Sequence, residues 1–201
     1  NSLVLVILFI FASIMKIKIE NATPDMASHI ASLIMEAMDH DCCRNFAGPD
    51  HTLDDFRDMM TRLVAMDDSQ YSYLNTLVAM VGDEVAGCLV AYDGKDLLRL
   101  RKRFVEEARR CLGRDFSSMD EETRAGEYYI DSLCVKTRFR KRGIATKLIS
   151  GVIRRHGTQP VGLLVDHTHP WAERLYRAIG FRFVDETTWG GHAMNHLQYI
   201  P

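Results

Sequence analysis

Residues 130–149 read IDSLCVKTRFRKRGIATKLI, and this stretch decides the fold. Its first part, up to Val135, consists mostly of β-forming residues and predicts a strand. Its last part predicts a helix, because Ile144, Leu148 and Ile149 recur at helical spacing. A basic turn that ends in Gly143 joins the two. The sequence therefore predicts a strand, a basic glycine-containing loop and a helix.

The start of this helix is suited to bind a polyphosphate. A helix N-terminus presents unpaired backbone N–H groups and the positive end of the helix dipole. Gly143 has no Cβ and Ala145 is nearly as small, so a pyrophosphate can approach the backbone closely. Arginine also binds phosphate oxygens in bidentate fashion. The turn carries four basic residues, Arg138, Arg140, Lys141 and Arg142. The alternative is a solvated basic turn in front of a surface helix.

Two blocks of the sequence resemble the motifs of the GNAT superfamily of N-acetyltransferases. Residues 140–145 (RKRGIA) resemble the motif Arg/Gln-x-x-Gly-x-Gly/Ala, which in that family cradles the pyrophosphate of acetyl-CoA. Residues 172–181 (AERLYRAIGF) resemble the family's Ala-x-x-Leu-Tyr-x-x-x-Gly-Phe, the helix beside the thiol end of the cofactor. With residues 22–25 (ATPD) near the front, the resemblance covers about residues 15–200.

The resemblance implies an α/β (mixed α+β) fold of the GNAT-like acyl-CoA acyltransferase type. The expected sheet is central, mostly antiparallel and six- to seven-stranded, flanked by helices and splayed between strands 4 and 5. The implied function is N-acetyltransferase (EC 2.3.1.-), moving the acetyl group of acetyl-CoA to a primary amine by direct attack, without a metal. The acceptor is expected to be a small-molecule or peptide amine. The alternative is a non-catalytic acyl-CoA-binding or regulatory module with the same fold.

The resemblance also assigns cofactor-binding positions. In the family, the pantetheine arm enters the gap between the splayed strands and bonds to strand backbone at positions matching Leu133, Cys134 and Val135. His169 stands where the family usually has an Asn that touches the cofactor, three residues before Ala172. The pyrophosphate cradle corresponds to the loop and helix start, residues Arg140, Lys141, Arg142, Gly143, Ile144, Ala145 and Thr146.

Asp131 is the first catalytic candidate. A carboxylate inside an apolar strand is costly unless it is paired or used. An ammonium must lose a proton before it can attack a thioester, so a nearby base would help, directly or through water. Family members with a side-chain base often carry it four or six residues before the position matching Val135, here Asp131 and Tyr129. The alternative is an Asp bonded to a neighbouring turn or to an Arg.

A period of two divides the central strand, predicted over residues 127–135, into two faces. One face would carry the odd-numbered residues Tyr129, Asp131, Leu133 and Val135. The other would carry the even-numbered residues Tyr128, Ile130, Ser132 and Cys134.

Tyr176 is the second catalytic candidate. Coenzyme A leaves as a thiolate, and a phenol within reach can protonate or stabilise it. The position of Tyr176 in the family motif implies this role of general acid, whereas the residue alone would more often be helix packing. Cys134 is a conceivable acetylated nucleophile, but no activating base is evident in the sequence.

The composition favours a single domain without a strong charge preference. The chain has 201 residues, 47% of them hydrophobic, which suffices for a good core. Its net charge of −2 gives no general attraction to nucleic acid or anionic membranes. The five cysteines contain no C-x-x-C pair, so we interpret them as reduced thiols of a cytoplasmic protein. Family members are often dimers, which makes a homodimer one expectation.

The N-terminus begins with an apolar run from Leu3 to Phe11. It is too short to span a bilayer, which takes about 20 apolar residues, and no basic segment precedes it. Met15 stands directly before the first family-like strand, residues 16–20. We therefore interpret residues 1–14 as an extension that is not necessarily native, and residues 15–201 as the GNAT N-acetyltransferase domain.

The remaining elements follow from periodicity and caps. We expect a helix over residues 24–38, a loop at Asp39-His40-Asp41, and a helix capped by Thr52 and Asp55. Residues 77–81 and 85–92 read as a β-hairpin, residues 161–165 as a buried strand, and residues 181–184 and 194–200 as closing strands.

Residues 94–126 form a helical insertion relative to the family. Its apolar face would carry Leu97, Leu100, Phe104, Ala108 and Cys111. Its charged side is expected to be solvated, with attraction of an acidic partner as the alternative; that side comprises Arg99, Arg101, Lys102, Arg103, Arg109 and Arg110. If the insertion covers the acceptor cleft, it determines substrate choice.

The histidines late in the chain are minor candidates. His192 and His196 could line the acceptor pocket, although exposed or structurally bonded histidines are commoner. A metal site from His167 and His169 is a weak alternative, because no carboxylate or cysteine completes a ligand set.

Overall fold

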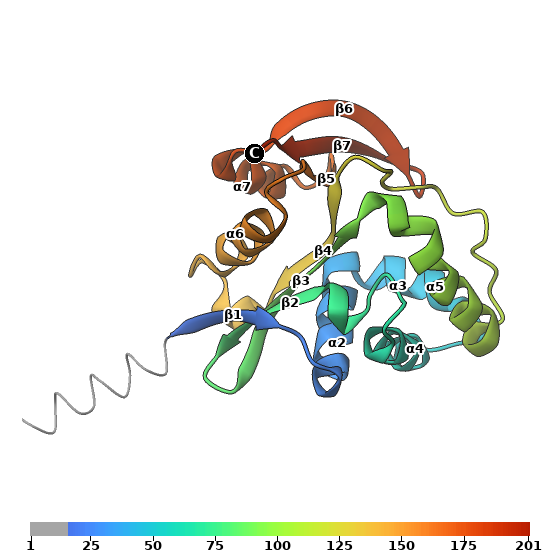
Figure 1. Cartoon of the computed structure of the whole chain (residues 1–201). Coiled ribbons are helices and arrows are strands. Elements are labelled where there is room, and N and C mark those ends of the chain that lie inside the picture. Colours follow the sequence, from blue (N-terminus) through green and yellow to red (C-terminus); the bar gives the residue numbers. More distant parts are fainter. Residues whose placement is uncertain (1–15) are drawn as a thin grey trace, which may run out of the picture.

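The computed structural model describes residues 16–201, and its centre is a seven-stranded sheet in the order β1-β2-β3-β4-β5-β7-β6 (Figure 1). All neighbouring strands are antiparallel except β4 and β5. The strands are β1 (Ile17–Asn21), β2 (Thr76–Val81), β3 (Glu84–Asp93), β4 (Tyr128–Val135), β5 (Val161–Asp166), β6 (Arg182–Trp189) and β7 (His192–Tyr199). This confirms the predicted mixed, mostly antiparallel sheet. The proposed extension and the start at Met15 lie outside the described residues.

Helices cover both faces of the sheet. One face carries α2 (Ala27–Met38), α3 (His40–Ala47), α4 (Leu53–Ala65) and α5 (Leu97–Leu112), and the other carries α6 (Ile144–His156) and α7 (Pro170–Ile179). Each layer has its own apolar core. Ile34 and Phe104 pack with Val90 on the first face, and Leu148 packs with Leu89 on the second. Burial of these aliphatic and aromatic side chains is the main favourable contribution to folding.

Local caps explain where the helices begin. Thr52 and Asp55 form the predicted capping box of α4, with each side chain bonded to the other residue's backbone N–H. The loop expected at residues 39–41 is wrong, because α3 begins at His40. Asp39 adopts a positive φ of 66° and its side chain accepts a hydrogen bond from the Cys42 N–H at 2.8 Å. Asp39 thus caps a second helix directly behind α2.

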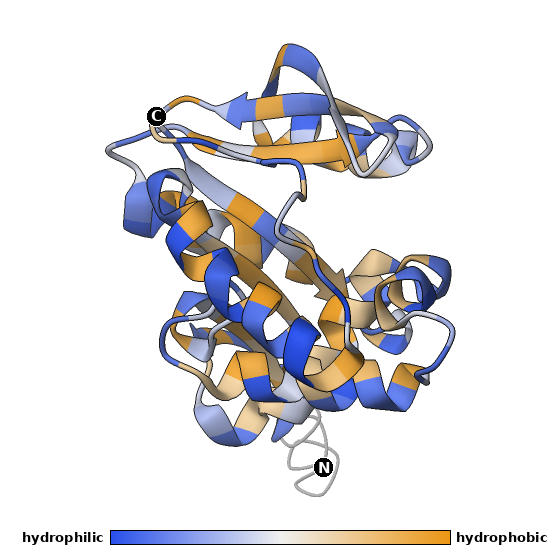
Figure 2. Ribbon diagram, turned by 90° about the vertical axis from the view of Figure 1, so that its right-hand side faces the viewer, coloured by the Kyte–Doolittle hydropathy of each residue, from blue (hydrophilic) through white to orange (hydrophobic). Residues whose placement is uncertain are grey.

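The insertion consists of α5 followed by a segment without regular structure, residues 113–126, which we call the strap. Gly113 ends α5 in the left-handed region at φ 61°, where glycine carries no steric cost. The strap then returns along the outside of the molecule to the start of β4 (Figure 1). Its Asp120 accepts a hydrogen bond at 3.1 Å from the N–H of Gly190, in the turn between β6 and β7. Figure 2 shows from this side that the β6–β7 hairpin lies above the helices.

The sheet opens between β4 and β5. The two strands pair only through Tyr128 with Val161 and Tyr129 with Gly162. Beyond these pairs, β4 remains bonded to β3 and β5 to β7, while the edges of β4 and β5 that face each other have no strand partner. The splay that the resemblance implied is therefore present, and it begins one residue before Asp131.

Asp131 forms a β-bulge at this point. Val90 of β3 pairs with Ser132 and Ala91 pairs with Ile130, so Asp131 has no opposite residue. The extra residue shifts the alternation of side chains, and the strict period of two predicted for β4 is wrong beyond it. Ile130 belongs to the core under α6 and α7, together with the even-numbered Tyr128.

Beyond the bulge the faces are exchanged. The odd-numbered Leu133 and Val135 pack against the core that contains Ile130, and the even-numbered Cys134 lies in the opposite core. Asp131 is thus the one unpaired residue between two regularly paired parts of β4.

Candidate active site

The loop between β4 and α6 leaves the start of the helix open. Gly143 precedes α6 with φ 75°, and it offers no side chain to cap the first turn. The first backbone hydrogen bond into the helix runs from the Lys147 N–H to the Gly143 carbonyl at 3.0 Å. A Cβ at residue 143 would meet nothing within 4 Å, so the space in front of the loop is free. The N–H groups of the first turn are therefore open to a phosphate, and phosphate binding there stays a prediction.

Part of the positive charge of the loop is neutralised within the protein. Arg138 forms an ion pair with Glu84. Arg140 donates from Nε to the Val135 carbonyl at 2.9 Å and from Nη2 to Glu36 Oε1 at 2.7 Å. These carboxylate partners come from β3 and α2, and no local pattern in the sequence identifies them. The backbone N–H groups consequently carry the larger share of the expected phosphate binding.

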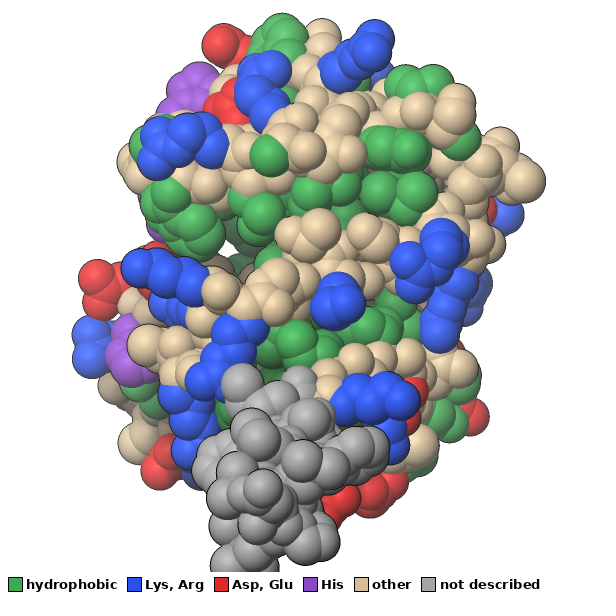
Figure 3. Space-filling view, turned by 90° about the vertical axis from the view of Figure 1, so that its left-hand side faces the viewer, with side chains coloured by type: hydrophobic (Ala, Val, Ile, Leu, Met, Phe, Trp, Pro, Cys, Tyr) green, Lys and Arg blue, Asp and Glu red, His purple; other side chains and the backbone are tan. Residues whose placement is uncertain are grey.

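The open edge of β4 continues from this loop into the molecule. Leu133, Cys134 and Val135 lie on the stretch that has left β5, so their backbone groups on that side are not used by a strand. Figure 3 views the side that carries α6 and α7 and shows a hollow between the two halves of the molecule, lined by hydrophobic side chains and flanked by Lys and Arg. An elongated ligand with an apolar arm and an anionic end matches this arrangement.

Asp131 is bonded to three side chains. Its carboxylate accepts hydrogen bonds from Tyr92 Oη at 2.9 Å, from Gln70 Nε2 at 3.2 Å and from Ser132 Oγ at 2.8 Å. Burial raises the pKa of Asp131 above its ordinary value, although the three hydrogen bonds and Arg101 act in the opposite direction. A carboxyl group with a raised pKa at the point where β4 parts from β5 is suited to accept a proton.

The partners of Asp131 continue into the insertion. Tyr92 Oη also lies 3.2 Å from Glu122 Oε1 in the strap. Glu122 in turn forms an ion pair with Arg101 of α5, and both side chains are only 6% exposed. The expectation that Arg101 belongs to a solvated face is therefore wrong. Its spacing contained the signal, because Arg101 lies four residues after the buried Leu97 and so falls on the apolar stripe.

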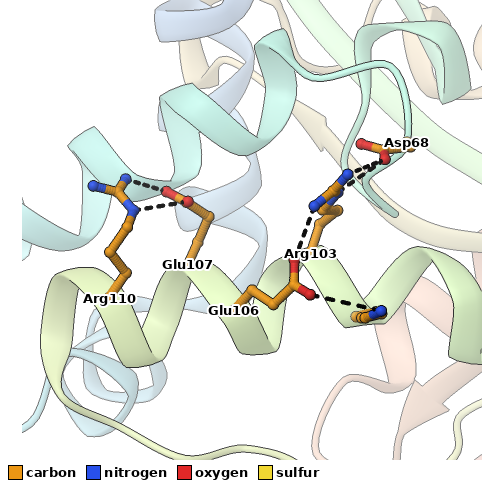
Figure 4. A network of polar contacts seen from close by, with 6 residues as sticks. Asp68, Arg103, Glu106, Glu107 and Arg110 are labelled. Carbon is orange, nitrogen blue, oxygen red and sulfur yellow. Dashed lines mark hydrogen bonds and ion pairs between the residues drawn. The ribbon is translucent and has the colours of Figure 1, made fainter.

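The other charges of α5 that Figure 4 shows are paired within the protein. Arg103 forms ion pairs with Asp68 at 2.7 Å and with Glu106 at 2.9 Å, and Arg110 pairs with Glu107 at 2.5 Å. Asp68 belongs to the loop between α4 and β2, which also contains Gln70. The contact between Arg103 and Asp68 joins the insertion to the loop that supplies a partner of Asp131, whereas the other two pairs lie within α5.

Gln70 is a site residue that the sequence analysis missed. Its side chain is 3% exposed, and its amide oxygen is buried without a hydrogen-bond partner among the residues that the structure describes. A buried amide oxygen without a partner is costly, so such a group is a candidate to receive a donor from a ligand. Nothing in the local sequence distinguishes Gln70 from other polar loop residues, and only the fold places it beside Asp131.

Tyr176 lies on α7 and contacts the apolar core of that side. Its ring centroid is 5.8 Å from that of Phe181, which shows the packing role directly. Burial raises the pKa of Tyr176 to about 12. The phenol therefore keeps its proton near neutral pH, which a general acid requires, and the role of acid stays a prediction.

The histidines have separate partners. His169 is exposed and lies 3.2 Å from Thr168 Oγ1, while His167 Nε2 lies 2.8 Å from Asn195 Oδ1. His192 pairs with Asp166 at 3.1 Å, and His196 contacts Glu127 at 2.8 Å. Within residues 16–201, no three His, Cys, Asp or Glu side chains are arranged so that they could hold a metal ion.

The cysteines are free thiols, and three of them, Cys43, Cys88 and Cys134, are buried. Burial, together with the charge of Glu36, raises the pKa of Cys134 to about 12. The thiol is therefore protonated near neutral pH and is a poor nucleophile. In the described part of the chain, we find no helix with the length and apolar character needed to cross a membrane.

Solved structures of acetyltransferases share this fold. An N-acetyltransferase from Staphylococcus aureus Mu50 is 25% identical and superposes with a TM-score of 0.77 over 90% of this chain and 100% of its own. A second acetyltransferase is 27% identical with a TM-score of 0.77, over 91% of this chain and 98% of its own. At 17% identity and a TM-score of 0.68, a histone acetyltransferase HPA2-related protein from Corynebacterium glutamicum covers 93% of this chain and 97% of its own, and shows the same fold.

The sequence comparisons agree with the structural ones. A search among curated protein sequences returned no significant match. The model of the acetyltransferase (GNAT) family matches residues 35–181, which include the bulge of β4, the open start of α6 and all of α7. On these grounds the chain belongs to the acetyltransferase (GNAT) family.

Proposed function

We propose that this protein transfers the acetyl group of acetyl-CoA to a primary amine by direct attack, with Asp131 as the proton acceptor and Tyr176 as the proton donor. The observation that carries the proposal is the position of Asp131. It lies at the bulge where β4 leaves β5, so the opening between the two strands and a partly buried carboxyl group meet at one point. The name N-acetyltransferase of the S. aureus protein with the same fold supports an amine as acceptor.

The chain offers two groups of residues to hold acetyl-CoA, whose thioester is the activated acetyl donor. The N–H groups of Ile144, Ala145 and Thr146 start α6 beyond the uncapped Gly143 and would bind the pyrophosphate. Lys141 and Arg142 add positive charge to the same loop, and His169 at the start of α7 is the proposed side-chain contact.

The backbone of Leu133, Cys134 and Val135 would hold the pantetheine arm along the open edge of β4. The carbonyl of Val135 already accepts a hydrogen bond from Arg140, so its N–H is the better candidate for a contact with the arm.

Asp131 is the better base of the two candidate positions. Burial raises the pKa of Tyr129 well above its ordinary value, so Tyr129 cannot accept a proton near neutral pH as a phenolate. The raised pKa of Asp131 makes its carboxylate a stronger base than an exposed aspartate. The unpaired Gln70 oxygen lies on the side chain that already contacts Asp131. We propose that it accepts an N–H of the acceptor amine and orients the lone pair.

Direct transfer is favoured over a covalent enzyme intermediate. The only nucleophile beside the cofactor edge that the sequence suggested is Cys134, and its pKa of about 12 leaves almost no thiolate near neutral pH. Tyr176, in contrast, holds a proton that it can give to the departing thiolate of coenzyme A.

The test combines turnover with binding. Free thiol release from acetyl-CoA is measured across a panel of small-molecule and peptide amines, with calorimetric binding of acetyl-CoA on the same sample. We expect amine-dependent release, a loss of roughly 10²–10⁴-fold in kcat/KM for Asp131→Asn, and a smaller loss for Tyr176→Phe. Cofactor binding should persist in both variants.

Three outcomes would contradict the proposal, wholly or in part. Binding without release for every amine favours the acyl-CoA-binding module, and an acetylated enzyme formed without an amine contradicts direct transfer. Full activity of Asp131→Asn would be compatible with acetyl transfer but would contradict the role of Asp131 as the base.

A further inference from the structure

The hydroxyl of Tyr92 lies between two carboxyl groups. It is 2.9 Å from Asp131 Oδ2 on β4 and 3.2 Å from Glu122 Oε1 in the strap. Tyr92 itself is on β3 and is 2% exposed, so water does not compete freely for these contacts. Glu122 in turn forms an ion pair with Arg101 of α5. Side chains from β3, the strap and β4 thus meet at one hydroxyl.

One hydroxyl hydrogen cannot serve two carboxylates at once. A phenol donates one hydrogen bond and can accept others. When Asp131 is ionised, the hydroxyl of Tyr92 satisfies it by donating to Oδ2. When Asp131 is protonated, its own O–H can donate to the Tyr92 oxygen, and the Tyr92 hydrogen is then free to turn to Glu122. The ion pair with Arg101 keeps Glu122 available as the carboxylate that accepts this hydrogen.

We propose that Tyr92 is a positioning residue whose hydroxyl turns from Asp131 to Glu122 when Asp131 takes the proton of the acceptor amine. This rests on the proposed role of Asp131 as the base. The protons balance. The ammonium loses one proton, Asp131 gains it, and Tyr92 keeps its own while changing the acceptor. Asp131 later releases the proton to solvent, and the hydroxyl turns back. The insertion therefore takes part in the reaction through Glu122 and Arg101.

The other groups around Asp131 do not offer the same exchange. Gln70 and Ser132 act on Asp131 as donors. Neither of them joins Asp131 to a second carboxylate, as Tyr92 does. The titratable and charged side chains that act on Asp131 from the surrounding elements are Tyr71 from the loop before β2, Tyr92 from β3, Arg101 from α5 and Tyr129 from β4, and Glu122 from the strap faces it across the Tyr92 hydroxyl.

The direct test follows the three groups by NMR in the full chain. The protein is labelled with ¹³C at the tyrosine Cζ and at the side-chain carboxyl carbons, and signals are assigned with Tyr92→Phe, Glu122→Gln and Asp131→Asn. We expect the Tyr92 Cζ and Glu122 Cδ signals to shift with the same pH midpoint as Asp131 Cγ. In Asp131→Asn, both shifts should disappear, because the group that drives them is gone.

A kinetic test uses two matched tyrosines. Tyr92→Phe removes a hydroxyl between two carboxyl groups, and we expect kcat to fall roughly tenfold, the worth of one hydrogen bond to a charged group. KM for the amine should change less, because Tyr92 does not touch it. Tyr73→Phe is the control, since the Tyr73 hydroxyl donates to a carboxylate of Asp67 alone, at 2.8 Å, and kcat should stay nearly unchanged.

The outcomes separate this inference from the proposed function. If Asp131 Cγ titrates while Tyr92 Cζ and Glu122 Cδ do not respond, the exchange is wrong and the base role stands. If all three titrate together but Asp131→Asn keeps full activity, the exchange exists and the base role is wrong. If Tyr92→Phe and Tyr73→Phe lower kcat equally, Tyr92 has no special role.

Discussion

The two sides of β4 are built in different ways. After Val135, the loop and α6 form the expected cofactor site from consecutive residues, and its main feature is backbone geometry at Gly143. Around Asp131, by contrast, the proposed acceptor side is assembled from side chains of separate segments. Gln70 comes from the loop before β2, and Glu122 comes from the strap. A site that binds through backbone leaves a short motif in the sequence, whereas a cluster of side chains from distant segments does not.

The two sides also differ in exposure. The Arg140–Glu36 ion pair beside the cofactor loop is 52% and 42% exposed, while the Arg101–Glu122 pair is 6% exposed at both side chains. Solvent screens the first pair and competes for its charges. The second pair has given up its hydration, so each charge depends on the other. Equal substitutions on the two sides should therefore have very unequal effects.

The largest expected effect is on stability at the buried pair. Arg101→Gln leaves Glu122 as an uncompensated buried charge, and we expect the free energy of unfolding to fall by about 3–5 kcal/mol. Arg140→Gln is the matched change in the exposed pair, and it should cost less than about 1 kcal/mol. Denaturant unfolding of both variants measures the difference. Similar losses in the two variants would show that the buried pair is hydrated, which removes the contrast between the two sides.

The next effect concerns Gly162, which pairs with Tyr129 at the last contact before the strands part. A Cβ at residue 162 would lie 1.8 Å from Glu127 Oε2, and this oxygen holds His196 and Gln198, both at 2.8 Å. Gly162→Ala must displace the buried carboxylate, so we expect a loss of about 2–4 kcal/mol from overpacking and lost hydrogen bonds.

Gly151 on α6 provides the control for this change. Its added Cβ would meet the flexible end of Leu77 at 3.1 Å and lie at an ordinary contact distance of 3.5 Å from Ile19, and alanine favours a helix over glycine. Gly151→Ala should therefore be neutral or slightly stabilising in the same unfolding measurement. If Gly162→Ala is equally harmless, Glu127 is free to move, and its hydrogen bonds to His196 and Gln198 do not hold the start of β4.

The same contrast explains which parts of the fold and of the candidate site could be predicted from the sequence. The strand, loop and helix of residues 130–149 were predictable because each depends on neighbours in sequence, and the hairpin of β2 and β3 followed from alternation and a turn. The bulge at Asp131 was not predictable, since it depends on the register with β3. Arg101 was misplaced because a charged residue on an apolar stripe is normally solvated. Its partner Glu122 lies 21 positions along the chain.

A smaller effect is expected for cofactor affinity at Gly143. Gly143→Ala places a methyl group where the pyrophosphate is proposed to approach, in a left-handed conformation with φ 75°. We expect the Kd for acetyl-CoA, measured by calorimetry, to rise on the order of tenfold, equivalent to about 1.4 kcal/mol.

Gly113→Ala is the matched control for backbone strain. Gly113 has φ 61° at the end of α5, and it also has nothing within 4 Å of an added Cβ. Both variants should lose similar stability, about 1–2 kcal/mol, because alanine is disfavoured in this conformation. Only Gly143→Ala should weaken acetyl-CoA binding. Equal affinities in the two variants would mean that the pyrophosphate does not lie against Gly143.

The smallest expected effect is a pH dependence at the start of β4, where both sides of the site are anchored. The hydrogen bond with Glu127 raises the pKa of His196. Burial opposes ionisation of Glu127, but the bonds from His196, Thr123 and Gln198 outweigh it and lower the pKa of that carboxyl group. The stabilisation from His196 is therefore complete below its unfolded pKa of about 6.5 and is lost as pH rises through the raised value. The stabilisation from Glu127 is complete above its unfolded pKa of about 4.3 and is lost as pH falls through its lowered pKa in the folded state.

The window in which both contributions are present is thus roughly pH 5 to 6.5. We expect His196→Gln to lower the free energy of unfolding most within this window and less near pH 8.5, because the neutral imidazole keeps a hydrogen bond but not the charge. His192→Gln is the control, since His192 is 65% exposed beside Asp166 and its loss should change little at either pH. Denaturant unfolding at the two pH values gives the comparison. A His196→Gln effect that grows toward pH 8.5 would mean that neutral His196 binds Glu127 better than the charged form does, and β4 would then be held by hydrogen bonds alone.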